Sequence, residues 1–313
     1  MESIIEPVSK DLLKAELSEE RFFLESNRGG NLLYIVDNAC APNVIREIGR
    51  LREIAFRSRE SGTGKCCDLD QFDLDPTYHF KQLVLWDPNA EEIMGGYRFV
   101  YGDEVLFGED GQPIIPSAHQ FVFSDKFLKG EFRHTIELSR SFVSLDFQNS
   151  LNSIRSIFAL DSLLDGIKNL ITRSNGRMEN FFGKMGISFS FPEDGKNMIL
   201  FFLKKHFGGP EARALVRSKQ EVPIKDEARW EAIFTGATFQ EDYRILKAEM
   251  KKTGQFIPPL VNTYMKLSPT MKYFGAAINE SFSGDIECGI LIRYVDIHAD
   301  KVERYHREEE NRP

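Results

Sequence analysis

The chain has 313 residues, which suits one large domain or two smaller ones, and its 42% apolar content is ample for a folded core. A formal net charge of −8 argues against nucleic acid as a general partner. The acidic N-terminus lacks the apolar segment of a secretion signal, and the longest apolar run, MILFFL at 198–203, is far too short to span a membrane. We therefore expect a cytoplasmic protein with free cysteines, soluble or in peripheral contact with the inner membrane face.

Helices and strands alternate in the first two thirds of the chain. The first predicted helix spans 41–62, where apolar residues recur every three or four positions, with Asn43 as a candidate cap for its start and Gly62 for its end. The elements predicted after it are two strands within 80–102 joined by a turn at 87–89, a strand at 131–143, a helix at 150–176, a strand at 178–191 and a helix at 195–209.

The pattern is weaker beyond residue 209. It predicts a helix at 238–252, a break at Pro258-Pro259 and a strand at 287–297. We divide the chain into an N-terminal extension at 1–40, a core at 41–209, a helical segment with a closing strand at 210–300 and a charged tail at 301–313.

Two segments are locally basic, at 204–219 and 244–252. The simpler interpretation is that they are solvated helix faces. The alternative is a docking surface for an acidic carrier protein or an anionic membrane.

Candidate site residues begin on the first helix and in the loop after it. Arg52 and Phe56 lie four apart and so share a helix face. Asp70 and Asp73, with Asp68 beside them, follow in the segment DLDQFD. Close carboxylates suggest calcium, but the glycine and the late glutamate of an EF-hand loop are missing. These acids are better suited to hold a substrate ammonium or to orient basic side chains, and we predict no metal site.

Two later strands carry the other candidates. Arg98 follows a glycine pair in GGYRFV, and Glu137 and Arg140 stand three apart in IELSRSFV. Residues three apart in a regular strand point to opposite faces. A β-bulge between Glu137 and Arg140 would bring both to one face and leave N–H groups for a cofactor arm or a thioester oxyanion. Without a bulge, Glu137 and Arg140 would be an ordinary acid and base on the surface. The corresponding alternative for Arg98 is a structural arginine within a pair of strands.

The order and spacing of these residues resemble the acyl-homoserine-lactone synthases of the GNAT acyltransferase superfamily. The resemblance is closer to the related hemolysin-like N-acyltransferases, which include the ornithine-lipid and glycine-lipid synthases. It covers about 45–290 and rests on the segments DLDQFD, GGYRFV, ELSRSFV, NFFGKMGISFSF and IPPLVNTYMKL. The tryptophan that lactone synthases carry after the first helix is absent, which argues against a signal synthase.

The resemblance implies an α/β fold with a mixed, mostly antiparallel central sheet flanked by helices and a C-terminal extension. In GNAT enzymes the pantetheine arm lies between two splayed strands, here 131–143 and 178–191. CoA users carry a glycine-rich turn for the pyrophosphate after the first of these, whereas SLDFQNSLNS at 144–153 has no glycine. We therefore expect acyl-ACP as the donor, with acyl-CoA possible, and no permanently bound cofactor.

The implied reaction is direct attack of a neutral amine on the thioester carbonyl, with Glu137, Arg140 and Arg98 as the catalytic set. Glu137 is the expected general base, acting through a water, with its pKa kept low by pairing with Arg140. Arg52, Arg98 or Arg140 is expected to hold an amino-acid carboxylate, because arginine suits bidentate contacts of this kind.

The remaining candidates are expected to bind the substrates. Asp70 and Asp73 would attract the ammonium or position the arginines. Phe56, Phe142 and Val143 would line an acyl channel, with ordinary core packing as the alternative.

The sequence thus predicts an N-acyltransferase that moves a 3-hydroxy fatty acyl group to an amino acid such as glycine or ornithine, forming a lyso-aminolipid. The expected partners are the acyl carrier protein, the amino-acid acceptor and an O-acyltransferase that completes the lipid. The alternatives are a non-catalytic acyl-binding or membrane-active hemolysin-like protein and, from the resemblance, a lactone-type signal synthase.

Overall fold

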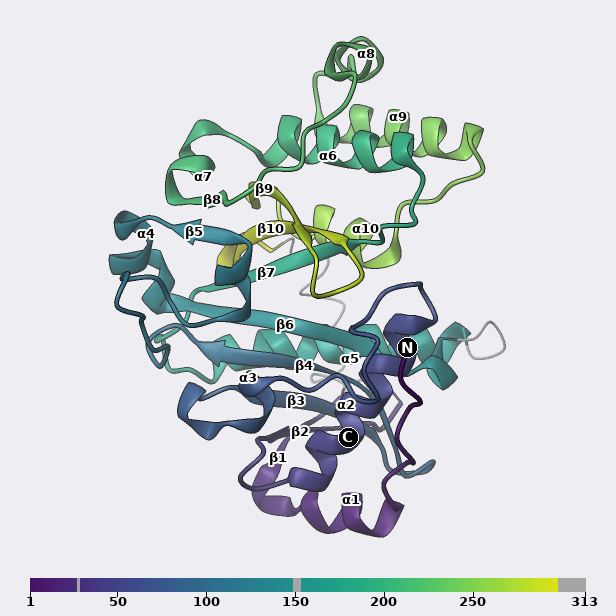
Figure 1. Ribbon diagram of the computed structural model, residues 1–313, viewed down its shortest axis with the longest axis vertical. Coiled ribbons are helices and arrows are strands. Elements are labelled where there is room, and N and C mark those ends of the chain that lie inside the picture. The colour runs from purple at the N-terminus through teal and green to yellow at the C-terminus, as the bar shows by residue number, and fades with distance from the viewer. Residues whose placement is uncertain (27–28, 149–152, 298–313) are drawn as a thin grey trace, which may run out of the picture.

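The computed structural model describes residues 1–26, 29–148 and 153–297, and it confirms the predicted α/β fold with a mostly antiparallel sheet (Figure 1). The strands are β1 (Phe22–Glu25), β2 (Leu32–Val36), β3 (Lys81–Asp87), β4 (Glu92–Tyr101), β5 (Phe121–Phe123), β6 (Thr135–Val143), β7 (Asn180–Ile187), β8 (Val216–Ser218), β9 (Lys272–Asn279) and β10 (Asp285–Arg293). Within the described ranges, eight of them form one sheet in the order β1-β2-β3-β4-β6-β7-β10-β9, and β5 pairs with β8.

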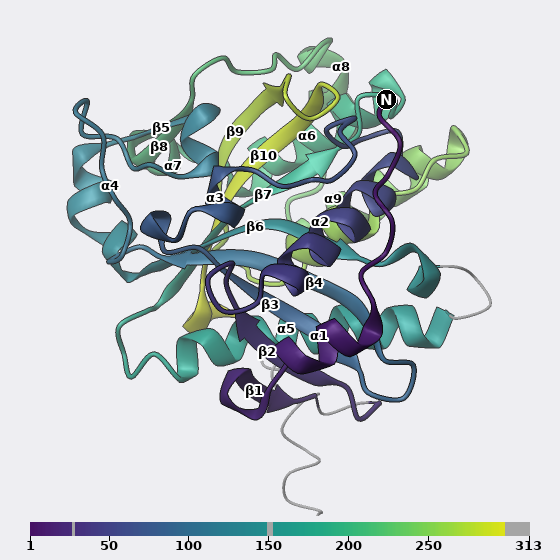
Figure 2. The same ribbon diagram turned by 60° about the horizontal axis from the view of Figure 1, so that its bottom comes forward.

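Helices cover both faces of this sheet. The longer ones are α2 (Pro42–Arg57), α5 (Ser153–Thr172), α6 (Glu193–Phe207) and α9 (Phe239–Lys252). The shorter ones are α1 (Lys10–Glu16), α3 (Gln71–Leu74), α4 (Asp125–Lys129), α7 (Pro210–Leu215), α8 (Glu227–Ile233) and α10 (Pro259–Met265). Figure 2 shows α2 in front of β3 and β4, with α5 behind the same strands. In the described chain, no helix is both long and apolar enough to cross a membrane.

Strand β3 shows why the sheet is covered on both sides. Its apolar side chains alternate between two clusters: Val84 and Trp86 pack with α2, and Leu83 and Leu85 pack with α5. Burial of each such side chain contributes about 1.5–3 kcal/mol. Gly166 of α5 lets the helix come close to the sheet, because a Cβ there would lie 2.5 Å from Leu33 and 2.9 Å from Leu83.

The pairing of β6 with β7 is the one parallel contact in the large sheet among the described residues. It joins Thr135–Leu138 to Asn180–Gly183 and then stops, although both strands continue. β6 stays paired with β4, and β7 stays paired with β10. The two strands therefore splay apart in the middle of the sheet, as the resemblance implied for 131–143 and 178–191.

Some local predictions are corrected by the structure. Asn43 does not cap α2, because Pro42 begins the helix and a side chain from α1 takes the capping role. Glu16 accepts hydrogen bonds from the backbone N–H of Asn43 at 3.2 Å and of Val44 at 2.8 Å. The helix ends at Arg57, before the loop in which Gly62 adopts a φ of +104°.

Three strands of the large sheet were absent from the predictions. β1 and β2 lie in the segment 1–40 and pair onto β3, and β9 lies in the segment 210–300 and pairs with β10. The predicted break at Pro258-Pro259 separates α9 from α10, which begins at Pro259. The charged tail at 301–313 lies outside the described residues.

Candidate active site

Arg52 of α2 is completely buried, and its guanidinium is held by two partners. One nitrogen, Nη1, donates to Asp73 Oδ1 of α3 at 2.9 Å, and Nη2 donates to Gln82 Oε1 of β3 at 2.6 Å. Gln82 Nε2 donates in turn to the same Asp73 oxygen at 2.8 Å. A buried charge is tolerated only when it is paired and hydrogen-bonded. This closed triangle therefore fixes α3 against α2 and β3.

Arg98 of β4 extends the network on the same face of the sheet. Its Nη1 donates to Asp70 Oδ1 at 2.6 Å and to Asp73 Oδ2 at 2.9 Å, and its Nε donates to Ser139 Oγ of β6 at 3.1 Å. Burial alone would lower the pKa of Arg98, but Asp73 and Asp70 outweigh it and raise that pKa. Burial alone would raise the pKa of Asp73, but Arg52 and Arg98 hold it well below its usual range. Arg98 and Asp73 therefore form an ion pair at neutral pH.

The single-turn helix α3 is held in place by its own acids. Asp70 Oδ1 accepts from the backbone N–H of Phe72 at 2.9 Å, and Asp73 Oδ2 accepts from the N–H of Asp70 at 3.1 Å. Each oxygen of Asp73 thus accepts two hydrogen bonds. The side chain of Asp70, in contrast, is 32% exposed, so it is the acid of this pair that a substrate can reach.

β6 contains a β-bulge, which was one of the two alternatives left open by the sequence, and it begins at Arg140 itself. Two residues of β6, Arg140 and Ser141, stand opposite the single residue Tyr97 of β4. Arg140 adopts a left-handed φ of +50°, which is uncommon for a residue other than glycine and occurs preferentially at functional sites. The extra residue turns Arg140 onto the face that carries Arg98, and Ser141 contacts Tyr97 on the opposite face.

Arg140 has two acidic neighbours that offset its charge, but its hydrogen bonding is incomplete. Its Nε lies 3.1 Å from Asp68 Oδ2, its Nη2 lies 3.9 Å from Asp70 Oδ2, and its guanidinium stacks 4.7 Å from the ring centre of Phe282. Neither Arg140 Nε nor Asp68 Oδ2 makes a well-aligned hydrogen bond within the described part of the chain. Burial raises the pKa of Asp68, and Arg140 and Arg52 oppose this rise. Arg140 thus keeps donor capacity for a ligand.

Glu137 has surroundings that differ from those predicted. Its Oε1 accepts a 2.5 Å hydrogen bond from Ser117 Oγ, and its Oε2 has no hydrogen-bond partner among the described residues. The prediction that pairing with Arg140 keeps the pKa of Glu137 low is wrong, because Arg140 pairs with Asp68 instead. Complete burial raises the pKa of Glu137, with the Ser117 hydrogen bond and the charge of Arg98 opposing the rise. Glu137 is thus closer to a neutral-pH base than a surface glutamate is.

A cavity of about 80 Å³ opens where β6 and β7 diverge. Its polar lining residues are Arg98, Ser139, Arg140, Lys184, Glu287 and the hydroxyl residues Tyr97, Ser141 and Tyr264. Lys184 of β7 forms an ion pair with Glu287 of β10. A water needs about 10–15 Å³, so this polar cavity has room for a few water-sized groups or one small molecule. Glu137 does not line the cavity but lies behind its wall, because it adjoins the lining residue Leu138 in sequence and its partner Ser117 adjoins the lining residue Pro116.

A second cavity of about 330 Å³ is mostly apolar and lies among α2, α5, α10 and the end of β6. The three residues predicted to form an acyl channel, Phe56, Phe142 and Val143, all line it. The other lining residues are Ala55, Arg59, Tyr97, Ser141, Gln148, Leu160, Leu163, Pro259 and Leu260. Tyr97 and Ser141 line both this apolar cavity and the polar cavity. Tyr97 and Ser141 therefore form a boundary that the two cavities share.

The structure thus brings the predicted site residues together, and it adds others. Asp68 was visible in DLDQFD, and Ser139 and Ser141 were visible inside IELSRSFV, but none was assigned a role. Tyr264 lies in the segment IPPLVNTYMKL, whose function the resemblance left open. Tyr97 was likewise visible inside GGYRFV without a role. Three further residues come from separate elements and carry no local signal: Gln82, Ser117 and Glu287.

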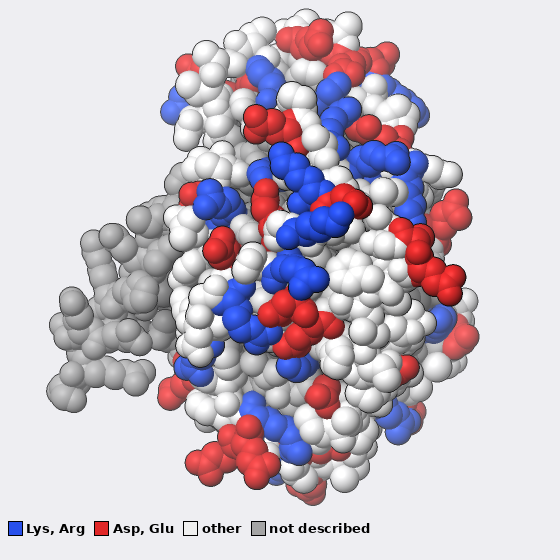
Figure 3. Space-filling model, turned by 90° about the vertical axis from the view of Figure 1, so that its left-hand side faces the viewer, with Lys and Arg blue, Asp and Glu red and all other residues white. Residues whose placement is uncertain are grey.

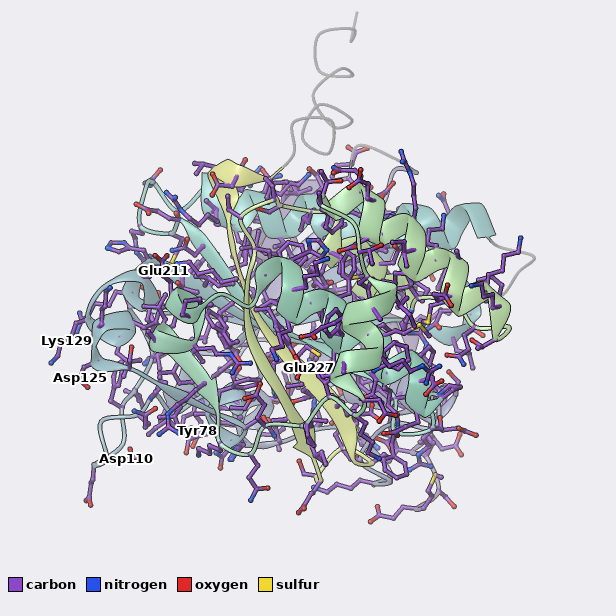
Figure 4. All side chains as sticks on the ribbon, turned by 90° about the horizontal axis from the view of Figure 1, so that it is seen from above. Tyr78, Asp110, Asp125, Lys129, Glu211 and Glu227 are labelled. Atoms are coloured by element: carbon purple, nitrogen blue, oxygen red, sulfur yellow. The ribbon has the colours of Figure 1, made fainter. Side chains whose placement is uncertain are left out.

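The two basic segments, 204–219 and 244–252, carry part of their charge in ion pairs within the chain. Lys204 pairs with Glu227 of α8, labelled in Figure 4, and Lys205 pairs with Asp242 of α9 at 2.6 Å. Figure 3 shows the face of the molecule that lies on the left in Figure 1, where basic and acidic groups are interspersed. These pairs favour solvated helix faces over a uniformly basic docking surface. The glycine-free loop 144–153 is described only in part, because 149–152 lie outside the described residues.

Comparison with known proteins was made with the sequence and with the structure. The family model for an acetyltransferase (GNAT) domain matches residues 51–154. The chain is 47% identical over 305 residues to a glycine N(alpha)-acyltransferase of Phocaeicola vulgatus, covering 97% of this chain and 93% of that protein. It is 48% identical over 301 residues to a glycine N(alpha)-acyltransferase of Bacteroides thetaiotaomicron, covering 96% of this chain and 88% of that protein. A solved CoA-dependent acyl-homoserine lactone synthase with SAM and isopentyl-CoA is 11% identical, with a TM-score of 0.39 and 89% of each chain covered.

Proposed function

This chain belongs to the GNAT acyltransferase family that includes the glycine N(alpha)-acyltransferases, and from this premise we propose that it transfers a fatty acyl group from acyl carrier protein to the amine of glycine. That it is an acyltransferase follows from the family. The interpretation as a non-catalytic binding protein is therefore set aside. The observation that carries the finer proposal is the pair of adjoining cavities, one small and polar beside Arg140, the other apolar.

Glycine suits the small polar cavity better than ornithine does, because the cavity holds only a few water-sized groups. Arg52 and Arg98 are already held by acids and amides of the protein. Of the three candidate arginines, Arg140 is therefore the one assigned to the acceptor carboxylate, since its guanidinium lines the cavity and keeps unused donors. The exposed carboxylate of Asp70 is assigned to the incoming ammonium.

In the reaction, the amine nitrogen forms a bond to the thioester carbonyl carbon, and the carbon–sulfur bond breaks to release a thiol. The nitrogen loses a proton and the leaving thiolate gains one. Glu137 is assigned as the general base. Its raised pKa fits this role, and its place behind the cavity wall means that it acts through a water. Holding the amine and the thioester in adjoining cavities supplies much of the rate acceleration over the reaction in solution.

The fatty chain is assigned to the apolar cavity lined by Phe56, Phe142 and Val143. Its pantetheine arm is assigned to the gap between β6 and β7, where the facing strand edges lack ladder partners beyond Leu138 and Gly183. The acyl carrier protein is proposed over CoA as the donor because the segment 144–153 has no glycine to cradle a pyrophosphate.

The proposal is tested by incubating the purified chain with 3-hydroxyacyl-ACP and an equimolar mixture of free amino acids, followed by mass spectrometry. A parallel reaction contains the matching acyl-CoA, and a third contains the acyl-ACP without enzyme. We expect N-acylglycine in the ACP reaction above all other N-acyl amino acids. A dominant N-acylornithine would overturn the glycine assignment, and product from CoA alone would overturn the donor assignment.

A further inference from the structure

Three hydroxyl groups meet on the face of the sheet opposite the arginine network. The hydroxyl of Tyr264, on α10, lies 3.2 Å from the hydroxyl of Tyr97 on β4. The side chain of Ser141, which the bulge in β6 turns toward Tyr97, lies close enough to the Tyr97 hydroxyl to lower its pKa, against the larger effect of burial. Both phenols are buried. No step of the proposed reaction uses any of the three.

This hydroxyl cluster (Ser141, Tyr97 and Tyr264) lies at the boundary between the two cavities. Tyr97 and Ser141 line both the polar and the apolar cavity, and Tyr264 lines the polar cavity. If the acyl chain occupies the apolar cavity and the amine enters the polar one, the bond between them forms at the boundary. The group at that boundary is the thioester carbonyl.

The hydroxyl cluster has donors to spare. Three hydroxyls carry three protons, and the hydrogen bond between Tyr97 and Tyr264 uses one of them. It is the one well-aligned hydrogen bond that either phenol makes within the described residues. A buried donor without an acceptor carries a cost of about 1–3 kcal/mol, which a ligand oxygen at this point would remove.

We propose that Tyr97, at the centre of this cluster, donates a hydrogen bond to the carbonyl oxygen of the acyl thioester, and that Tyr264 positions it. The inference rests on the proposed function. As the amine attacks, the carbonyl π electrons move onto oxygen, and the Tyr97 O–H stabilises the oxyanion without giving up its proton. The electrons return to carbon when the carbon–sulfur bond breaks. In these terms Tyr97 is a catalytic residue and Tyr264 is a positioning residue.

The electrostatics of the cluster agree with a donor role. Burial raises the pKa of Tyr97, and burial raises that of Tyr264 well above its usual value, with the charge of Tyr97 adding to the rise. Both hydroxyls therefore keep their protons at neutral pH. A phenol held by two neighbours also needs little reorganisation when the oxyanion develops.

The test compares Tyr97→Phe and Tyr264→Phe with Tyr273→Phe in the full-length enzyme. Tyr273 of β9 is equally buried and lines neither cavity, so it controls for loss of a buried phenol hydroxyl. We expect Tyr97→Phe to lower kcat by about 10²–10³-fold with KM for glycine little changed, as removal of one oxyanion donor does. We expect a smaller fall in kcat for Tyr264→Phe and none for Tyr273→Phe.

Each variant is assayed with a plain acyl-ACP and with a 3-hydroxyacyl-ACP. A fall in kcat of similar size for both donors supports the proposal. A fall confined to the hydroxylated donor would show that the cluster binds the chain hydroxyl, and this would overturn it. Wild-type kcat in Tyr97→Phe would also overturn it, whereas failure of the wild type to make N-acylglycine would instead refute the proposed function. If Tyr97→Phe does not fold, Ser141→Ala, which keeps both phenols, must lower kcat for both donors.

Discussion

Two groups of charged residues share one face of the sheet and are built in opposite ways. In the first, Arg52, Arg98 and Asp73 are buried, and both oxygens of Asp73 accept two hydrogen bonds each. In the second, Glu137 has one carboxylate oxygen without a partner, and the Nε of Arg140 makes no well-aligned hydrogen bond among the described residues, although it is ion-paired with Asp68. In the first group Asp73 has no acceptor capacity left, and the one unpartnered donor, Nε of Arg52, belongs to a residue that lines neither cavity. In the second group Arg140 lines the polar cavity.

The difference indicates which residues hold the site and which act in it. A saturated buried network fixes geometry and resists removal of any member. An unsaturated buried group is costly, so it persists where a ligand or a water completes it. The candidate roles predicted for the six charged residues together therefore divide, with Arg52, Arg98 and Asp73 as supports and Glu137, Arg140 and Asp70 as the reactive side.

The strongest way to break this comparison is to remove the base. Glu137→Gln keeps the shape of the side chain and the contact with Ser117 but cannot accept the amine proton. We expect kcat to fall about 10²–10⁴-fold with an unchanged fold, measured by initial rates and circular dichroism. Wild-type activity in this variant would place Glu137 with the structural residues.

Asp73→Asn tests the supporting side. It keeps the size of the side chain but leaves Arg52 and Arg98 with too little negative charge, so we expect a loss of about 3–5 kcal/mol in the free energy of unfolding by urea. Asp125→Asn is the control, because the Asp125–Lys129 pair on α4 is exposed at the outer edge of the molecule (Figure 4). We expect the control to unfold as the wild type does. Equal midpoints for both variants would mean that the buried network does not hold the site.

Arg140→Lys sharpens the assignment of the acceptor carboxylate. Lysine keeps the charge opposite Asp68 but loses the planar fork, so we expect KM for glycine to rise about tenfold or more with a smaller change in kcat. The matched control is Arg177→Lys, which changes an exposed arginine paired with Asp103 at 2.8 Å. A rise in KM of the same size in the control would refute the assignment.

The assignment of the fatty chain to the apolar cavity can be tested by changing the volume of that cavity. Leu160 of α5 lines the apolar cavity and is only partly buried, so substitution there disturbs the core little. We expect Leu160→Phe to shift kcat/KM toward shorter acyl chains and Leu160→Ala toward longer ones, each by about tenfold. Competition between acyl-ACPs of different length measures the shift, and movement of both variants in one direction would exclude the apolar cavity as the chain site.

The smallest effect concerns pH and stability. Burial raises the pKa of Glu137 above its ordinary value of 4.5, so the folded protein binds this proton more tightly than the unfolded chain does. The charged form therefore lowers stability as the pH rises above 4.5, until the raised pKa has been passed. We expect the Tm of Glu137→Gln to exceed that of the wild type increasingly over this interval and to match it below pH 4.5. A difference in Tm that stays constant with pH would contradict the prediction, because it could not arise from ionisation of Glu137.

The sequence predicted the parts of the site that follow local rules. The spacing of Arg52 and Phe56 on a helix follows from helix periodicity, and strand geometry raised a bulge near Arg140 as one of two alternatives. The partner of Glu137 was beyond reach, because Ser117 lies 20 residues away in sequence and only the tertiary fold brings it near. The same holds for Tyr97 and Tyr264, which are separated by 167 residues. Short edge strands such as β1 escaped because four residues carry too little pattern.

The position of β10 in the sheet has a consequence for the timing of synthesis. This strand ends at Arg293, yet it pairs along the whole of β7 and supplies Glu287, Ile290 and Ile292 to the wall of the polar cavity. A ribosome produces a chain from its N-terminus at roughly 5–20 residues per second, so this wall is the last part of the site to be made. A nascent chain that has completed β7 but not β10 exposes an unpaired strand edge in the middle of the sheet. The wall of the polar cavity is thus complete only after β10 has been synthesised.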